Sequence, residues 1–169
     1  MSADDGLSRS VAAVRELFDA AACSCARATS DGSALTFVAA DGVGAAEVIG
    51  VEVPVGRGLV GWAAMSGQPV AVRDVRTDAR FAQDIAESTG YVPTVVFAAP
   101  FFDQGGEVLG VLEILDPGID TSGDWPLAVL GTLASQLAAV VSEGGASEAD
   151  QRFAALGRQV ASMVETHRG

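Results

Sequence analysis

Apolar residues recur at helical spacing near both ends of the chain. Residues 7–22 carry an apolar stripe that faces one side of a helix, formed by Leu7, Val11, Val14 and Phe18 and widened by Leu17 and Ala21. Residues 126–142 carry a second stripe of leucines and valines, and Pro126 lies in the first turn, where its missing N–H costs little. A sequence that resembles a capping box, at 147–150, precedes a third stripe and predicts a helix over 148–167.

Short apolar runs separated by turn residues occupy the middle of the chain and predict strands. Asp31-Gly32, a pair typical of hairpin turns, separates the runs at 23–29 and 34–40. Pro54 confines a short strand over 51–55 to a sheet edge or a strand end. Three further strands are expected over 70–72, 94–102 and 107–115, and a turn joins the last two into a hairpin.

The segments between these runs are glycine-rich or polar. Residues 41–50 are expected to form a loop, and residues 73–92 a long loop with a helical turn near 80–87. Residues 56–65 predict a tight turn that enters a helix. The resulting order is helix, two strands, loop, strand, helix, strand, long loop, two strands and helix. This order predicts an α+β fold, with a central antiparallel sheet of about five to six strands and helices packed on it.

Two stretches of the chain are similar to motifs of the GAF family, a relative of PAS domains. The first comprises Gly56-Arg-Gly-Leu-Val-Gly61, then Ser66-Gly-Gln-Pro-Val70, then a loop that starts with Asp74-Val-Arg-Thr-Asp. The second is Ala99-Pro-Phe101 followed by Gly105-Gly-Glu-Val-Leu-Gly-Val-Leu-Glu-Ile-Leu115. With the flanking helices the resemblance covers residues 7–142, and it implies a PAS-like sensory or ligand-binding domain.

The resemblance implies a pocket between one face of the sheet and the helix and loop of residues 58–97. Aromatic and other apolar side chains gather in this segment, and they suit a pocket lining or an ordinary core equally well. The candidate ligand-binding residues in this region are Trp62, Met65, Phe81, Tyr91, Thr94 and Phe97.

Members of the GAF family bind cyclic nucleotides, bilins, haem or small metabolites, and many have no known ligand. The Lys and Phe of the family's cyclic-nucleotide signature are absent from residues 116–124. A Cys that could carry a bilin is absent between residues 58 and 116, and the core has no His for haem. The resemblance therefore leaves the ligand and any cofactor unknown.

Charge and composition narrow the classes of partner. The formal net charge over 169 residues is −12, so a nucleic-acid backbone would be repelled. We expect no membrane span, and the acidic N-terminus lacks the basic start of a signal peptide, which predicts a cytoplasmic protein. The sequence has no lysine, and His167 is its one histidine. These counts exclude lysine chemistry and make a multi-histidine metal site or a Ser-His-Asp triad hard to build.

Two motifs have both a structural and a chemical interpretation. Cys23 and Cys25, at i and i+2, point to one face of a strand, and we expect them to be inert core thiols rather than redox groups. The pattern Gly56-x-Gly58-x-x-Gly61 matches the dinucleotide fingerprint only as a string, because no second parallel strand follows a full helix. A tight turn and close helix–sheet packing explain these glycines better.

Carboxylates at two places also have two interpretations. Asp74 and Asp78 lie near Arg80, and we expect them to cap a helix and tie the loop by ion pairs, the alternative being acid–base chemistry. Glu113 interrupts an apolar strand, and exposure at a sheet edge is expected. The alternative is a buried carboxylate, which needs an arginine or a ligand as its partner.

Together these observations predict a non-catalytic sensory or regulatory GAF module. Residues 1–143 form the domain, and residues 144–169 form a Gly-Gly hinge and an amphipathic helix. The module is expected to bind a small molecule, to dimerise through its terminal helices and to act on an output domain or partner protein. A last helix folded back over its own domain is the alternative to the dimer. The alternative functions are a ligand-free interaction and dimerisation scaffold and, third, a GAF-type free methionine sulfoxide reductase.

Overall fold

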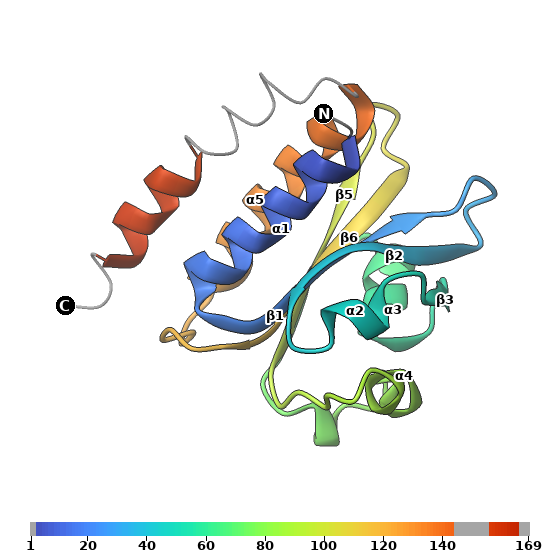
Figure 1. Cartoon of the computed structure of the whole chain (residues 1–169), viewed down its shortest axis with the longest axis horizontal. Helices are drawn as coiled ribbons and strands as arrows, with labels where there is room; N and C mark the ends of the chain where they lie inside the picture. The colour runs from blue at the N-terminus through green and yellow to red at the C-terminus, as the bar shows by residue number, and fades with distance from the viewer. Residues whose placement is uncertain (1–2, 144–155, 166–169) are drawn as a thin grey trace.

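The sheet has six strands, all antiparallel to their neighbours, in the order β3-β2-β1-β6-β5-β4 (Figure 1). The computed structural model describes residues 3–143 and 156–165. The strands are β1 (Ala20–Ala28), β2 (Ala34–Gly42), β3 (Glu52–Pro54), β4 (Val70–Val72), β5 (Val96–Phe102) and β6 (Val108–Pro117). Helices pack on both faces of this sheet, which confirms the predicted α+β class. Pro54 lies on an edge strand, as its missing N–H requires.

One face of the sheet is covered by α1 (Ala3–Phe18) and α5 (Trp125–Glu143), which pack side by side (Figure 1). The predicted stripe of α1 is buried, since its four main members are at most 2% exposed. The helix ends earlier than the apolar pattern predicts, because Asp19 has a φ of 48° and turns the chain out of the helix. Residues 20–22, predicted as helix, are therefore the first residues of β1.

Helix α5 supplies much of the core on this face. Residues 125–142 have a mean hydropathy of 1.5 and are long enough to cross a membrane, which corrects the expectation that no stretch is. In the described structure, however, Leu130, Leu133 and Leu137 are fully buried in the same core as α1 and the sheet. The structure therefore shows α5 as a core helix.

The helix over residues 156–165 lies beside α1 (Figure 1). Val160 and Val164 are 3% and 6% exposed and belong to the core formed by α1 and α5. The described part of the predicted C-terminal helix thus folds back over its own domain. The Gly-Gly pair at 144–145 lies outside the described residues. Dimerisation stays a prediction.

The opposite face carries α2 (Ala45–Val48), α3 (Gly58–Ser66), the short helix η1 (Val75–Thr77) and α4 (Gln83–Ser88). The glycine pattern shapes the entry to α3. Gly56 and Gly58 have φ values of 92° and 67°, and a Cβ on Gly61 would lie 2.6 Å from the carbonyl oxygen of Pro54. The pattern is therefore a tight turn with a close helix–strand approach, as expected.

Candidate functional site

A cavity of about 90 Å³ lies between the sheet and the helices of the second face. Strands β1, β2, β5 and β6 contribute its floor, and α2, the start of α3 and the α4 segment contribute its walls. The lining is mainly apolar and includes Phe37, Val53, Leu59, Phe81, Ile85 and Val96. A volume of this size holds several water molecules, so a compact organic group can replace them.

Helix α4 is held over this cavity at both ends. At one end Asp84 forms an ion pair with Arg57, which precedes α3. At the other end α4 approaches α2 so closely that a Cβ on Gly44 would lie 3.3 Å from the carbonyl oxygen of Thr89. No residue of α4 is buried. A short helix with so little burial belongs to the least stable part of a fold and can open locally.

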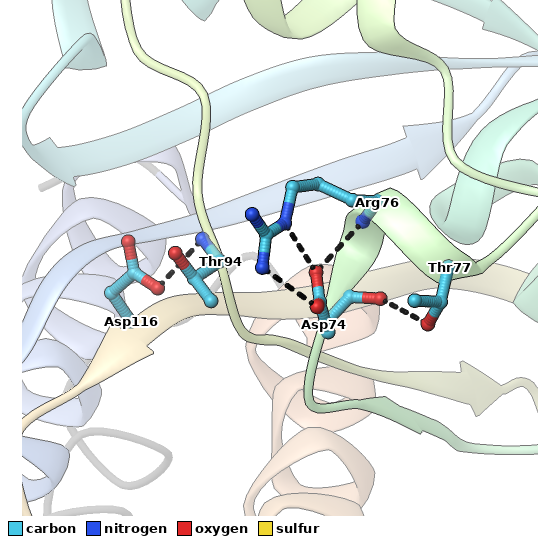
Figure 2. Close-up of polar contacts among 5 residues, drawn as sticks. All are labelled: Asp74, Arg76, Thr77, Thr94 and Asp116. Atoms are coloured by element: carbon cyan, nitrogen blue, oxygen red, sulfur yellow. Dashed lines mark hydrogen bonds and ion pairs between the residues drawn. The ribbon is translucent and has the colours of Figure 1, made fainter.

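The chain that follows α4 is fastened to the end of β6 by Asp116. The Asp116 carboxylate accepts hydrogen bonds from the backbone N–H groups of Thr94 at 2.9 Å and Val95 at 2.8 Å; the Thr94 bond is drawn in Figure 2. It also accepts a hydrogen bond from the hydroxyl of Tyr91. Burial, followed by this hydrogen bond, raises the pKa of Tyr91 to about 12. The cover of the cavity thus has a third attachment.

The loop that leads to α4 contains two local Asp–Arg ion pairs, each supported by a hydrogen bond to the backbone. Asp74 caps η1 and accepts from the backbone N–H of Arg76 at 3.1 Å and from its guanidinium at 3.0 Å (Figure 2). Asp78 binds Arg80 in the same way, with N–H and guanidinium bonds of 2.9 Å. These hydrogen bonds lower the pKa of both carboxyls. The expected capping and ion-pairing role of this set is confirmed.

Two of the six candidate ligand-binding residues, Phe81 and Tyr91, line the cavity. Trp62 lies outside it, because the guanidinium of Arg80 covers its ring, 4.5 Å from the centroid. Met65, on the outer side of α3, is 59% exposed and does not reach the cavity either. The structure thus places both residues outside the cavity lining, and their role in ligand binding stays a prediction.

The remaining two candidates, on or before β5, also lie elsewhere. Thr94 is exposed, and its backbone N–H is bonded to Asp116. Phe97 is fully buried on the α5 face, because side chains alternate along a strand and its neighbour Val96 takes the cavity side. The guanidinium of Arg73 lies 5.6 Å from the centroid of the Phe97 ring. Because side chains alternate between the two faces of β5, Phe97 lies on the face opposite the cavity.

Both cysteines point into the core beneath α1 and α5. Cys23 and Cys25 are free thiols with no exposed surface, and they share one face of β1. Burial raises the pKa of Cys25 to about 12 and that of Cys23 well above its ordinary value. Because the thiolate is the reactive form, such cysteines are inert. The expected core-packing role is confirmed.

Glu113 and Ser24 are cavity residues outside the candidate set, although the sequence left a buried Glu113 with an arginine or a ligand as its partner open as the alternative. Glu113 was expected at an exposed sheet edge, but β6 is a central strand, and Glu113 lies opposite Ser24 of β1 and Ala98 of β5. Glu113 and Ser24 both line the cavity, and neither forms a hydrogen bond or ion pair within the described part of the chain. Burial raises the pKa of Glu113 to about 7. The signal for this residue was a lone carboxylate in an apolar strand.

The fold agrees with what comparison with known proteins finds. A family model for the GAF domain matches residues 2–141. The dual 3′,5′-cyclic-AMP and -GMP phosphodiesterase 11A of Takifugu rubripes is 33% identical over 66 residues, which are 39% of this chain and 7% of that protein. The chain thus corresponds to a small part of this relative.

Two solved structures show the same fold at low sequence identity. The GAF domain of a phosphoenolpyruvate-protein phosphotransferase from Coxiella burnetii has a TM-score of 0.73 at 22% identity, covering 84% of this chain and 83% of that one. The free methionine-R-sulfoxide reductase from Neisseria meningitidis, in complex with its substrate, has a TM-score of 0.68 at 20% identity, covering 89% and 80%. With the family model matched over most of its length, the chain belongs to the GAF domain family.

Proposed function

We propose that this GAF domain is a non-catalytic sensory or regulatory module whose cavity binds a small molecule. GAF domains occur in signalling proteins, where they commonly bind small ligands and sit beside output domains. The observation that carries the proposal is a cavity under α4 whose floor holds Glu113, a carboxylate without a partner among the described residues. Ligand sites in proteins are mostly apolar pockets with a few such polar groups.

The non-catalytic part of the proposal rests on the thiols. A structural neighbour is a free methionine-R-sulfoxide reductase, and reduction of a sulfoxide by a protein thiol needs an accessible thiolate. The sequence has two cysteines. Both are buried on the far face of the sheet with raised pKa values. The burial of both thiols therefore supports a non-catalytic module over a reductase.

Cyclic nucleotides, named in the phosphodiesterase relative, fit the cavity poorly. A cyclic phosphate needs a cation or several free N–H groups. Arg57, the basic residue that lines the cavity, is already paired with Asp84. Glu113 would repel the phosphate. The proposed ligand is therefore not an anion of this kind.

The signalling role is supported by the layers of the fold. The cavity lies on the face of the sheet that carries α2, α3 and α4. Helices α1 and α5 and the helix over 156–165 lie on the other side (Figure 1). In the proposal these helices carry the response to an output domain or partner protein and form a homodimer. The net charge of −12 disfavours nucleic acids and anionic membrane surfaces as partners, and the proposal places the module in the cytoplasm.

The test combines native mass spectrometry of the freshly purified protein, a thermal-shift screen of metabolites and hydrogen exchange. A ligand at 100 times its dissociation constant stabilises the protein by about 2.7 kcal/mol, which is readily measured. Ligand binding should protect residues 73–92, which include α4. A hit that protects only α1 and α5 would place the site elsewhere. A protein that retains no ligand and gives no hit would be the ligand-free scaffold.

A further inference from the structure

The floor of the cavity is mainly apolar, but it contains one pair of neighbouring polar residues. Glu113 of β6 and Ser24 of β1 are paired across the two central strands, so their side chains leave the sheet on the same face. Both line the cavity, and no residue in the described ranges donates a hydrogen bond to either. On the other side of Glu113, β5 offers only the methyl group of Ala98.

The other ionisable groups at this cavity are accounted for. Asp41 is paired with Arg15 at 3.1 Å, and Arg57 is paired with Asp84. In each pair the arginine balances the charge of the aspartate. Glu113 is left as the cavity carboxylate to which the described chain supplies no counter-charge.

The neutral groups that border the cavity stay neutral near pH 7. The Tyr91 hydroxyl donates to Asp116, and burial with this hydrogen bond raises the pKa of Tyr91 to about 12. Cys23 also borders the cavity, but its thiol points into the core of the opposite face, and burial raises its pKa well above the ordinary value. Glu113, whose pKa burial raises to about 7, is thus the cavity group that changes charge in this range.

Resting on the binding function proposed above, we infer that the ligand is a compact organic cation with a protonated amine. The ammonium group donates to the carboxylate of Glu113 and the hydroxyl oxygen of Ser24, both of which accept hydrogen bonds. The apolar part of the ligand lies against the rings of Phe37 and Phe81, which line the same cavity.

Competing ligand classes leave a charge unbalanced. A carboxylate or phosphate ligand would place like charges together in a desolvated site. A neutral ligand can at most donate a hydrogen bond to Glu113, and it supplies no positive charge to balance the buried carboxylate. The net charge of −12 also raises the concentration of cations near the protein.

Three aromatic probes of one shape test this inference: benzylamine, benzyl alcohol and benzoate. Their affinities are measured by calorimetry or ligand-observed NMR at about pH 8, where Glu113 is mainly ionised and benzylamine is still protonated. We expect benzylamine to bind about 10- to 100-fold more tightly than benzyl alcohol, and benzoate not to bind. Hydrogen exchange of residues 73–92 locates the bound amine.

Two variants assign the effect. Glu113→Gln should lower the affinity for benzylamine to that for benzyl alcohol, and the alcohol should bind both forms equally. Glu52→Gln, which removes an exposed charge on the edge strand β3, should leave all three affinities unchanged. At about pH 5, where Glu113 is protonated, the wild-type preference for the amine should shrink toward that of Glu113→Gln.

Different results would overturn the cationic ligand and the proposed binding function. Equal binding of amine and alcohol, undiminished amine binding in Glu113→Gln, or binding of benzoate overturns the cation and leaves the cavity as a ligand site. Failure of all three probes also overturns it. If, in addition, no metabolite of the wider screen protects residues 73–92, the binding function itself falls.

Discussion

Above neutral pH, Glu113→Gln should be more stable than the wild-type protein, although the substitution removes a charged side chain. The pKa of Glu113 is raised from 4.5 to about 7, and burial is the cause. One pKa unit corresponds to about 1.4 kcal/mol, so the ionised form costs the fold at most about 3.5 kcal/mol. Water entering the cavity reduces this cost, because Glu113 is partly accessible from it.

The sign follows from proton linkage. The folded pKa lies above the unfolded one, so the stability associated with protonated Glu113 is fully present below pH 4.5 and is lost as the pH rises through about 7. Glutamine has no proton to lose. The free energy of unfolding of Glu113→Gln, relative to that of the wild type, should therefore increase by about 2 to 3 kcal/mol between about pH 5 and about pH 8.

Urea unfolding at both pH values measures this difference directly. All other titrating groups are common to the two proteins and cancel in the comparison. Glu52→Gln is the matched control, because it removes the same charge from an exposed position and should change stability by less than about 0.5 kcal/mol at either pH. The same stability difference at both pH values would refute the reasoning, since Glu113 would then not be desolvated in the native state.

Three further predictions follow from the fold. Cys23→Ala combined with Cys25→Ala should keep the fold at a cost of about 2 to 4 kcal/mol, and both native thiols should label slowly; fast labelling of either would contradict their burial. Tyr91 is the one tyrosine, so a spectrophotometric titration should show a midpoint near 12, raised mainly by burial; a midpoint near 10 would mean that Tyr91 is not held at Asp116. The stability that the protonated phenol gives is present below pH 10 and lost as the pH rises to about 12. Light scattering at micromolar concentration should give twice the mass of the chain, and a monomeric mass would exclude the dimer. Val160 is 3% exposed within its own domain, so the interface is probed at Met163, which is 50% exposed on the same helix. Met163→Asp should lower the mass, and an unchanged dimer in this variant would place the interface elsewhere.

Burial along single elements was predictable from the sequence. The apolar stripe of α1 and the leucines of α5 indicate which side of each helix packs against the sheet. Both sets of side chains are buried, as predicted. The hairpin turns at 31–32 and 103–106 join the strands that they were expected to join. These features depend on residues close together in the chain, where periodicity and turn chemistry act.

Features that depend on distant pairing were not predictable. Glu113 is in the interior of the sheet because β6 pairs with β1, some ninety positions earlier in the chain, as well as with β5. Phe97 points away from the cavity because the register of β5 gives that face to Val96 and Ala98. A strand pattern indicates that two faces exist, but the neighbouring strands decide which face meets which layer.

The pairing of β1 and β6 leaves a single layer of backbone between the cavity and the terminal helices. On β6, Glu113 faces the cavity while Leu112 and Ile114 are buried in the core of α1 and α5. Under the proposed binding function, a molecule that displaced Glu113 would therefore also move Leu112 and Ile114 within that core, with no intervening loop or hinge. The proposed signal from the cavity to the terminal helices would have one layer of strands to cross.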